Sequence, residues 1–324
     1  MRLVRVLAAL AGLAGIAWLV WEIGPESLLA QLRELSWRLP VLFLPYSLVA
    51  VLDAAGWRYA FPGQLPGLPV LVAARLAGEA VNVTTPTATL GGEPLKAWLL
   101  TRARVPFEEG LVSIVVAKTA LVVSHLGFLV LAVALAIWQT RPAPALLTLM
   151  VTLTVLGILA VGGFVWAQLH GLFGASSRAL AWLGVGDGVG GHLLRLDDHL
   201  VAYYRGQRDR LALSLFFHFS GWVAGSVEVW LALLLLGSPV DFATAIVIEG
   251  FASAIRSATF LIPASLGIQE GGFVGIFLGF GLSAGAGLAF GLVRRLRELL
   301  WAVAGYTILV AWRGPRGSVT GPGL

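Results

Sequence analysis

Residues 78–102, GEAVNVTTPTATLGGEPLKAWLLTR, interrupt a chain that otherwise consists of long apolar segments and polar connections. Two apolar runs, each too short to cross a bilayer comfortably, meet at Thr84-Thr85-Pro86. Four polar or charged side chains surround this break: Glu79, Asn82, Glu93 and Lys96. Exposed backbone and charge are costly in lipid unless protein or a water-filled cavity surrounds them, so we expect a functional site here.

The composition is that of an integral membrane protein. Of the 324 residues, 58% are hydrophobic and 12% are charged, and the mean hydropathy is +0.88. Such a chain has too little polar surface to coat a soluble globule. The formal net charge is +5, but the basic residues are scattered at the ends of apolar runs, which is typical of membrane proteins rather than of nucleic-acid binders. The sequence contains no cysteine, which excludes disulfides and cysteine-ligated metals.

Six apolar stretches have about the ~20 residues that a membrane-spanning helix needs. They are residues 3–21, 39–60, 110–138, 144–168, 211–236 and 285–312. The first stretch follows two arginines, as a signal peptide would, but it ends in Trp18 and Trp21 rather than in a small-residue cleavage site. We interpret it as a retained span, and the sequence predicts an all-α polytopic membrane protein with six full spans.

Two further apolar regions, 68–101 and 242–281, are each split by a break that contains proline. At 1.5 Å per residue, their halves would reach only ~20–25 Å, which is short of a ~30 Å hydrocarbon core. We interpret both regions as broken or re-entrant helical hairpins. The alternative is that each region forms two short, tilted spans.

A shift of 177 residues relates the two halves of the chain. It places scarce residue types on one another without a gap: Pro86 on Pro263, Glu93 on Glu270, Lys118 on Arg295, and Glu79 on Arg256. Each half then has an odd number of net crossings, so we expect two inverted repeats. The first repeat is 1–140. The second is 141–312, which includes a cytoplasmic connection at 169–210, and a flexible tail follows at 313–324.

The basic residues predict a topology that agrees with inverted repeats. With the N terminus inside, the outer loops carry only Arg33, Arg38 and Arg141, whereas the cytoplasmic segments carry many more arginines and lysines. Both termini are therefore expected in the cytoplasm, and the two hairpins would enter the membrane from opposite sides. Inverted repeats with discontinuous helices are typical of transporters.

The connections carry weaker patterns. Residues 25–35 have the apolar spacing of an interfacial helix. Gly186 to Gly191 formally match GxGxxG, but no strand precedes them, so we interpret them as a flexible linker rather than a nucleotide site. His192 and His199 are interpreted as solvated loop residues rather than metal ligands. The sequence thus predicts no cofactor and no metal site.

Each break is predicted to start a new helix. In the first, Gly91-Gly92 would let a ligand or a neighbouring backbone approach, and Glu93 would lie in the first turn, where the helix dipole stabilises a carboxylate. The second break repeats this arrangement. We interpret the two breaks as a gate formed by Glu79, Asn82, Pro86, Gly91, Gly92, Glu93, Pro263, Gly267, Gln269, Glu270, Gly271 and Gly272.

Basic residues within the apolar segments are predicted to line a substrate pathway, because they cannot face lipid cheaply. The candidates are Lys96, Lys118, Arg256, Arg294, Arg295 and Arg297. A cavity lined by these residues would suit an anionic headgroup, phosphate especially.

The alternative is that these charges pair with one another and hold the breaks in place without touching substrate. The pairs would be Glu93 with Lys118, Glu270 with Arg295, and Glu79 with Arg256. Whether Glu93 and Glu270 are structural partners or coupling groups stays open. Among the other polar residues, Asp53, Arg58 and Glu249 are interpreted as ion-paired or interfacial, and His125 and His218 as packed between helices.

Several motifs resemble those of a known family. The run from Leu90 to Lys96, with Asn82 and Thr85-Pro86, is similar to the flippase-like membrane domain of lysylphosphatidylglycerol synthases and their stand-alone relatives. The resemblance extends over nearly the whole chain through Ala117-Lys118-Thr119, IPASLGIQEGGF at 262–273 and VRRLREL at 293–299. Among the relatives, the chain looks most like the hopanoid-biosynthesis-associated membrane proteins.

The resemblance implies a multi-pass protein of the bacterial inner membrane that is not an enzyme. It would be a flippase-like translocase, moving an amphipathic lipid, hopanoid-type or anionic, across or out of the membrane, with membrane lipid as its partner. Pro263-Ala264-Ser265 departs from the Pro-Gly-Gly that relatives often have, and the lysine-transferring domain of the synthases has no counterpart in this sequence. The alternatives are an ion-coupled transporter of a small solute and a membrane-embedded lipid-modifying enzyme.

Overall fold

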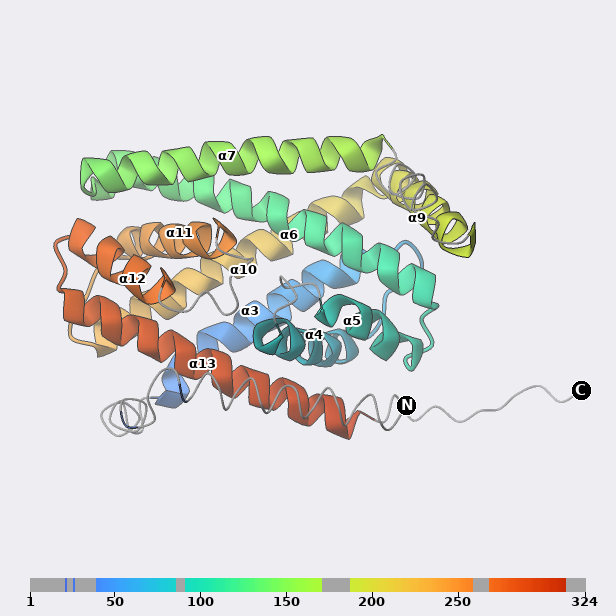
Figure 1. The fold of residues 1–324 in the computed structure, drawn as a ribbon, viewed down its shortest axis with the longest axis horizontal. Coiled ribbons are helices and arrows are strands. Elements are labelled where there is room, and N and C mark those ends of the chain that lie inside the picture. The colour runs from blue at the N-terminus through green and yellow to red at the C-terminus, as the bar shows by residue number, and fades with distance from the viewer. Residues whose placement is uncertain are drawn as a thin grey trace, which may run out of the picture.

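The computed structural model describes residues 39–85, 91–170, 187–258 and 268–312, together with Trp21 and Glu26. Apart from those two single residues, the predicted first span, interfacial helix and tail lie outside the described part of the chain. Every regular element in the described ranges is a helix (Figure 1). These helices are α3 (Leu39–Tyr59), α4 (Leu68–Thr84), α5 (Gly92–Thr101), α6 (Phe107–Leu135), the π-helix η2 (Ala136–Thr140), α7 (Pro144–Leu169), α9 (Asp187–Gly206), α10 (Arg208–Leu235), α11 (Phe242–Ala258), α12 (Ile268–Gly279) and α13 (Ala284–Ala311).

Five of the six predicted spans coincide with long helices, namely α3, α6 with η2, α7, α10 and α13. By length and composition, three helical segments in the described ranges could cross a membrane: Phe107–Thr140, Pro144–Leu169 and Arg208–Leu235. Helix α13 has 28 residues, but it carries four charged side chains between Arg294 and Glu298, which lower its hydropathy. The chain is therefore a helical membrane protein.

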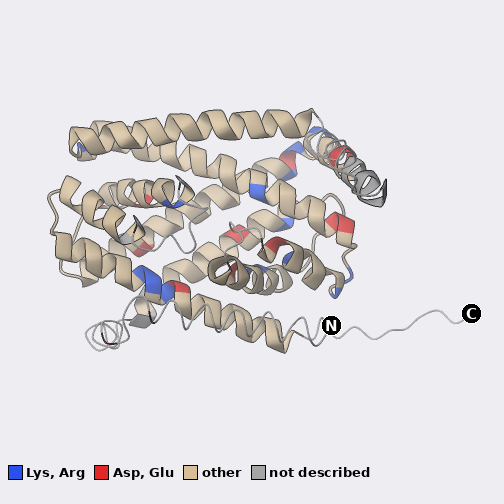
Figure 2. Cartoon of the chain, in the orientation of Figure 1, with Lys and Arg blue, Asp and Glu red and all other residues tan. Residues whose placement is uncertain are grey.

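Helix α7 is apolar along its whole length and largely exposed. Its 26 residues include no charged side chain, and only 11% of its apolar window is buried. It packs along α6 at one edge of the molecule and is uniformly tan in the charge view (Figures 1 and 2). Large apolar side chains such as Leu159 and Trp166 are exposed on it. A helix of this kind belongs in contact with lipid rather than with water.

Each predicted hairpin region forms two short helices that pack against each other, α4 with α5 and α11 with α12. The four helices have 17, 10, 17 and 12 residues. A 17-residue helix rises about 26 Å, which is less than a hydrocarbon core of about 30 Å. None of the four is therefore long enough to cross the membrane upright.

The end of α4 shows why the first region breaks. Thr85 caps the helix in an extended conformation, with φ −115° and ψ 142°, and it immediately precedes Pro86 in the sequence. Proline disfavours helical geometry in the residue before it. The Thr84 and Thr85 hydroxyls donate back to the carbonyls of Ala80 and Val81, at 2.8 and 2.6 Å, so both hydroxyls are satisfied within the last turn of the helix.

The order and packing of the helices repeat along the chain. Phe107, the first residue of α6, lies 177 positions before Ala284, the first residue of α13. The packing of α4 on α13 is matched by that of α11 on α6, the packing of α5 on α6 by that of α12 on α13, and the equivalent helices α3 and α10 pack on each other. The shift found in the sequence thus relates helices that pack in the same way.

One close contact repeats residue by residue. A Cβ atom on Gly110 would lie 3.6 Å from the Cα of Ala97, and one on Gly287 would lie 3.0 Å from the Cα of Val274. Both glycines and both of their neighbours are separated by 177 positions. In each half a glycine in the first turn of the long helix therefore admits the preceding short helix.

The apolar side chains form two clusters that meet at charged segments. One cluster contains Phe128 of α6 and Phe290 of α13, and the other contains Val116 of α6 and Tyr306 of α13. Between these residues, α6 carries Lys118 and α13 carries the Arg294–Glu298 segment. Charges consequently gather in the interior of the helix assembly (Figure 2).

The connection at 169–210 is more structured than the sequence suggested. Residues from Asp187 onward form α9, so the expected flexible linker over Gly186 to Gly191 is wrong for its described part. Apolar residues on one face hold this helix: Leu200 and Tyr203 are buried, and the Tyr203 hydroxyl donates to the Tyr59 carbonyl at 2.7 Å. Burial raises the pKa of Tyr203 to about 12, which keeps the hydroxyl protonated as a donor.

Candidate functional site

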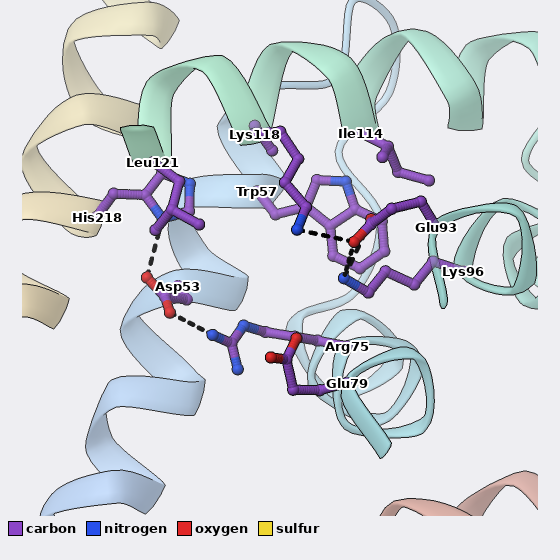
Figure 3. Close-up of a pocket in the computed structure, with 11 residues that line it drawn as sticks. Asp53, Trp57, Arg75, Glu79, Glu93, Lys96, Ile114, Lys118, Leu121 and His218 are labelled. Atoms are coloured by element: carbon purple, nitrogen blue, oxygen red, sulfur yellow. Dashed lines mark hydrogen bonds and ion pairs between the residues drawn. The ribbon is translucent and has the colours of Figure 1, made fainter. Parts of the chain in front are cut away.

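Two adjoining cavities lie among α3, α4, α6 and α10, and the larger one extends to α11 and α13. Their volumes are about 50 and 290 Å³. Both cavities are lined by Asp53, Arg75, Glu79, Lys118 and Leu121. Because they share these walls, we treat them as one polar site, of which Figure 3 shows the smaller part.

Glu93 is the centre of the first group of charges, which we call the Glu93 cluster. Its buried carboxylate accepts from Lys96 Nζ at 3.0 and 3.1 Å and forms an ion pair with Lys118 at 2.9 Å (Figure 3). Lys96 comes from the same turn of α5, and Lys118 points in from α6. One carboxylate therefore contacts two ammonium groups. Of the predicted pairs, Glu93 with Lys118 is formed.

Asn82 joins the two helices of the first hairpin. Its amide nitrogen donates to Glu93 at 3.2 Å, and its carbonyl oxygen accepts from the backbone N–H of Gly92 at 2.7 Å. The second bond satisfies one of the N–H groups that the start of α5 leaves without an intrahelical partner. The last turns of α4 are thus tied to the first turn of α5 directly beside the charge cluster.

The glycines at this junction permit a close approach. A Cβ atom on Gly92 would overlap the carbonyl of Gly78, and one on Gly78 would collide with the aliphatic chain of Lys96. Hence α4 and α5 touch backbone to backbone, and the stem of Lys96 lies across α4. The sequence predicted this close approach for the Gly91-Gly92 pair, without identifying Gly78 as the partner.

Asp53 links three helices at the other side of the smaller cavity. It forms an ion pair with Arg75 of α4, and its second oxygen accepts from His218 Nδ1 of α10 at 2.9 Å (Figure 3). Glycines make room here as well, because a Cβ atom on Gly221 would lie only 2.9 Å from the Asp53 carboxylate. Asp53 is ion-paired, as one of the two sequence interpretations had it, and it also lines the site.

A second group of charges, the Glu249 cluster, lies at the larger cavity. Glu249 of α11 forms an ion pair with Arg294 of α13 and lies 3.5 Å from Arg256. Nearby, Glu228 of α10 pairs with Arg297, whose guanidinium lies 4.3 Å from the centre of the Tyr46 ring. These contacts tie α13 to α11, α10 and α3 through desolvated charges.

The six predicted pathway residues divide into two sets. Lys96, Lys118, Arg256 and Arg297 line the cavities. Arg294 and Arg295 line neither cavity and are buried, Arg294 against Glu249 and Arg295 against Glu298 at 3.0 Å. The prediction that Arg294 and Arg295 line the pathway is therefore not supported for these two cavities, because ion pairs behind the wall hold both side chains.

The predicted gate residues are also distributed unevenly. Glu79, Asn82, Gly91, Gly92 and Glu93 lie at the first break, around the smaller cavity. Gln269, Glu270, Gly271 and Gly272 lie in the first turns of α12. Pro86, Pro263, Gly267 and the side chain of Glu270 lie outside the described part, so the pairing of Glu270 with Arg295 does too. Glu79 and Arg256 line the same cavity but do not form the expected pair, because Arg256 contacts Glu249 instead.

Two charged residues of the site were missed by the sequence reasoning, Arg75 and Glu228. Arg75 precedes Glu79 by four positions, so both lie on one helix face, and this spacing could have identified the pair of charges. Glu228 is an isolated acid in the apolar α10, which by itself marks a functional or paired position.

The remaining polar residues that the sequence singled out lie at the surface or pack between helices. Arg58 donates to the Pro66 carbonyl at 2.9 Å, and His199 is exposed. His125 packs between helices, 2.9 Å from the Ser253 hydroxyl and stacked on Trp222. His218 is packed as predicted, but it also contacts Asp53 of the site.

Comparison with known families gives one match. The family model described as the lysylphosphatidylglycerol synthase TM region matches residues 4–305, nearly the whole chain. No curated protein and no solved structure matches the chain.

Proposed function

Because this chain belongs to the lysylphosphatidylglycerol synthase TM region family, we propose that it is a flippase-like translocase of a membrane lipid. The family and the apolar helices make it a multi-pass membrane protein related to membrane lipids. The step to lipid movement rests on the site. It is a charged cavity of about 290 Å³ inside an assembly whose exterior is apolar.

The charged cavity is the observation that carries the proposal. A lipid that changes leaflets must bring its polar headgroup through a region where charge is expensive. A protein lowers that cost by offering polar partners to the headgroup while the acyl chains stay in the bilayer. The residues shared by the two cavities, together with the broken helices α4 and α5, supply such partners at the interior of the fold.

Repeated helix packing supports an alternating mechanism. In the proposed topology the two halves are inverted repeats, each with a broken hairpin, and both termini lie in the cytoplasm of a bacterium. Rocking of one half against the other would open the cavity to one leaflet at a time. The lipid would be hopanoid-type or anionic, and the protein would carry out no chemical reaction on it.

Reconstitution into vesicles tests the proposal. The full-length protein is incorporated with a fluorescent lipid probe, either an anionic phospholipid or a hopanoid-type lipid, and a membrane-impermeant quencher reports the fraction of probe in the outer leaflet over time. We expect the wild type to move an anionic probe faster than protein-free vesicles. Lys118→Ala should slow this movement at least tenfold, and Arg205→Ala, at an exposed position on α9, should not change it. Movement in the wild type at the protein-free rate, for both anionic and hopanoid-type probes, contradicts the proposal.

An ion-coupled transporter of a small solute is the second candidate, and the contact between Asp53 and His218 favours it. Protonation of such a buried pair could couple a proton gradient to movement. Solute uptake driven by an imposed pH gradient, with no lipid movement, would select this function. A membrane-embedded lipid-modifying enzyme is the third, and chemically altered lipid after incubation would select it.

A further inference from the structure

The Glu93 cluster has one buried and one cavity-facing cation. Lys96 has a side chain 8% exposed and donates to both oxygens of Glu93. Lys118 has a side chain 35% exposed, contacts one oxygen at 2.9 Å, and lines both cavities. If Lys118 moved away, Lys96 would still neutralise Glu93. Lys118 is therefore the exchangeable partner.

The Glu249 cluster has the same arrangement, with arginines in place of lysines. Arg294, with a side chain 4% exposed, pairs closely with Glu249 from behind the cavity wall. Arg256, with a side chain 38% exposed, approaches the same carboxylate only to 3.5 Å and lines the larger cavity. Glu249 keeps Arg294 as its counter-ion if Arg256 turns toward a ligand. Lys118 and Arg256 thus face one cavity from α6 and α11.

We propose that Lys118 and Arg256 together bind the phosphodiester group of a lipid headgroup in the larger cavity. This inference rests on the proposed function and assigns the substrate class of the same site. Arg offers a planar fork that matches phosphate oxygens, and Lys a compact charge that can follow them. Binding would exchange each cation's carboxylate contact for a phosphate contact, leaving Glu93 on Lys96 and Glu249 on Arg294.

The charge of the described cluster favours one negative charge. Five cations line the two cavities, Arg75, Lys96, Lys118, Arg256 and Arg297, and Arg294 pairs with Glu249 behind the wall of the larger one. Five carboxylates oppose these six cations, Asp53, Glu79, Glu93, Glu228 and Glu249. With a neutral His218, these described side chains carry one net positive charge. A monoanionic phosphodiester would neutralise it, and this balance matters more inside the protein, where the effective dielectric constant is lower than in water.

Two further groups narrow the class of ligand that the cavity is expected to bind. Nη1 of Arg75 is buried and has no acceptor among the described residues, so it is a donor that a ligand oxygen could satisfy. Glu79 lines both cavities and accepts no hydrogen bond or ion pair from any side chain that the structure describes. Its carboxylate repels a second negative charge on the ligand, which favours a phosphodiester over a dianionic phosphate monoester.

Ligand binding can be measured separately from transport. The purified full-length protein in neutral detergent is titrated with dihexanoyl-phosphatidylglycerol, glycerophosphoglycerol, inorganic phosphate and dihexanoylglycerol, and binding is read from thermal stabilisation. We expect the two phosphodiesters to bind, the lipid more tightly, and to bind at least tenfold more tightly than inorganic phosphate. Equal binding of dihexanoylglycerol or of inorganic phosphate would overturn the inference.

Substitutions test whether Lys118 and Arg256 bind the ligand. Lys118→Gln and Arg256→Gln should each weaken binding of the short-chain lipid at least tenfold, and the double variant should abolish it. Lys118→Arg and Arg256→Lys keep the charge and should retain most of the affinity, which also shows that the positions tolerate change. Arg205→Gln, on exposed α9, is the matched control and should bind like the wild type. Unchanged binding in the folded double variant would refute the site.

The vesicle assay separates this inference from the proposed function. If the phosphodiester binds as expected but the wild type moves no lipid, the translocase proposal fails and the binding site stands. If the double variant moves lipid at the wild-type rate, the binding site is wrong and the translocase proposal stands.

Discussion

The Glu93 and Glu249 clusters solve the same electrostatic problem with different residues. Each places one carboxylate between a buried cation and a cavity-facing cation, although the 177-residue shift does not superimpose them: Glu93 falls on Glu270, not on Glu249. The equivalent positions Glu79 and Arg256 even carry opposite charges and line one cavity. The helices repeat and the polar lining does not, so the two faces of the site are chemically distinct.

The largest expected effect comes from removing the shared carboxylates. Glu249→Ala leaves buried Arg294 without its counter-ion, and Glu93→Ala does the same to Lys96. Breaking a buried pair costs about 3–5 kcal/mol. Because lysine can lose its proton and arginine cannot, Glu249→Ala should be the more destabilising of the two.

Thermal unfolding in detergent, with recovery from size-exclusion chromatography, compares these two variants. Asp198→Ala, which removes a carboxylate at an exposed position on α9, is the control. A Glu93→Ala protein that unfolds at a lower temperature than Glu249→Ala would reverse the proposed ranking.

The second prediction compares the effect on stability of a glycine-to-alanine substitution at the start of α5 with that of one at the start of α12. Gly92→Ala would force a methyl group into the Gly78 carbonyl, which should destabilise the protein by about 1–3 kcal/mol through overpacking. A Cβ atom on Gly271 would have no atom of the described residues within 4 Å, so Gly271→Ala should be neutral or slightly stabilising. Equal losses of stability at the two positions, measured by thermal unfolding, would show that the close approach at Gly92 does not matter.

A smaller effect is expected from Glu79, whose carboxylate has no ion-pair partner among the described side chains. Glu79→Gln removes its negative charge from the cavity and should tighten binding of inorganic phosphate about three- to tenfold, with little change in stability. Titration followed by thermal shift measures both quantities. Asp209→Asn, at an exposed position on α10, is the control and should bind phosphate like the wild type. Weaker phosphate binding in Glu79→Gln would mean that Glu79 supports the anion rather than repels it.

The smallest expected effect concerns α9, which contacts the first half of the chain. Tyr203→Phe removes the hydrogen bond to the Tyr59 carbonyl while keeping the buried ring. Loss of one such bond costs about 1 kcal/mol, which includes leaving the carbonyl without this donor. Thermal unfolding measures the change, and an unaltered melting temperature would indicate that the ring alone holds α9.

Much of the fold follows from the sequence because length and hydropathy are strong constraints in a membrane. The long apolar runs form α3, α6, α7, α10 and α13, and each region that contains a proline break forms a pair of short helices. The connection at 169–210 was predicted less well. Its glycines were interpreted as a flexible linker, and the apolar helix face that buries Leu200 and Tyr203 was not recognised. Tertiary packing overrode a local pattern there.

The site could be predicted only in part. Glu93 was identified because charge at a helix break is rare, and Lys118 because a basic residue within an apolar span cannot face lipid cheaply. The structure forms the ion pair between them. The partner of Arg256 was assigned by symmetry, and the structure instead gives Glu249, since the side chain pairs with the acid that packing brings nearest. The predicted pair of Arg295 with Glu270 lies outside the described part of the chain and stays a prediction. Pairing depends on the distances between side chains, which an internal repeat does not fix.

Helix α7 has a consequence for the membrane itself. Its 26 residues contain no charge. They rise about 39 Å, which exceeds a hydrocarbon core of about 30 Å. The excess is accommodated by tilt, by local thickening of the bilayer or by helix ends that lie among the headgroups, and the balance depends on acyl-chain length. Since α7 packs directly on α6, which carries Lys118, hydrophobic mismatch at the edge of the protein acts on the helix that supplies a cation to the cavity. Bilayer thickness then becomes a variable of the site.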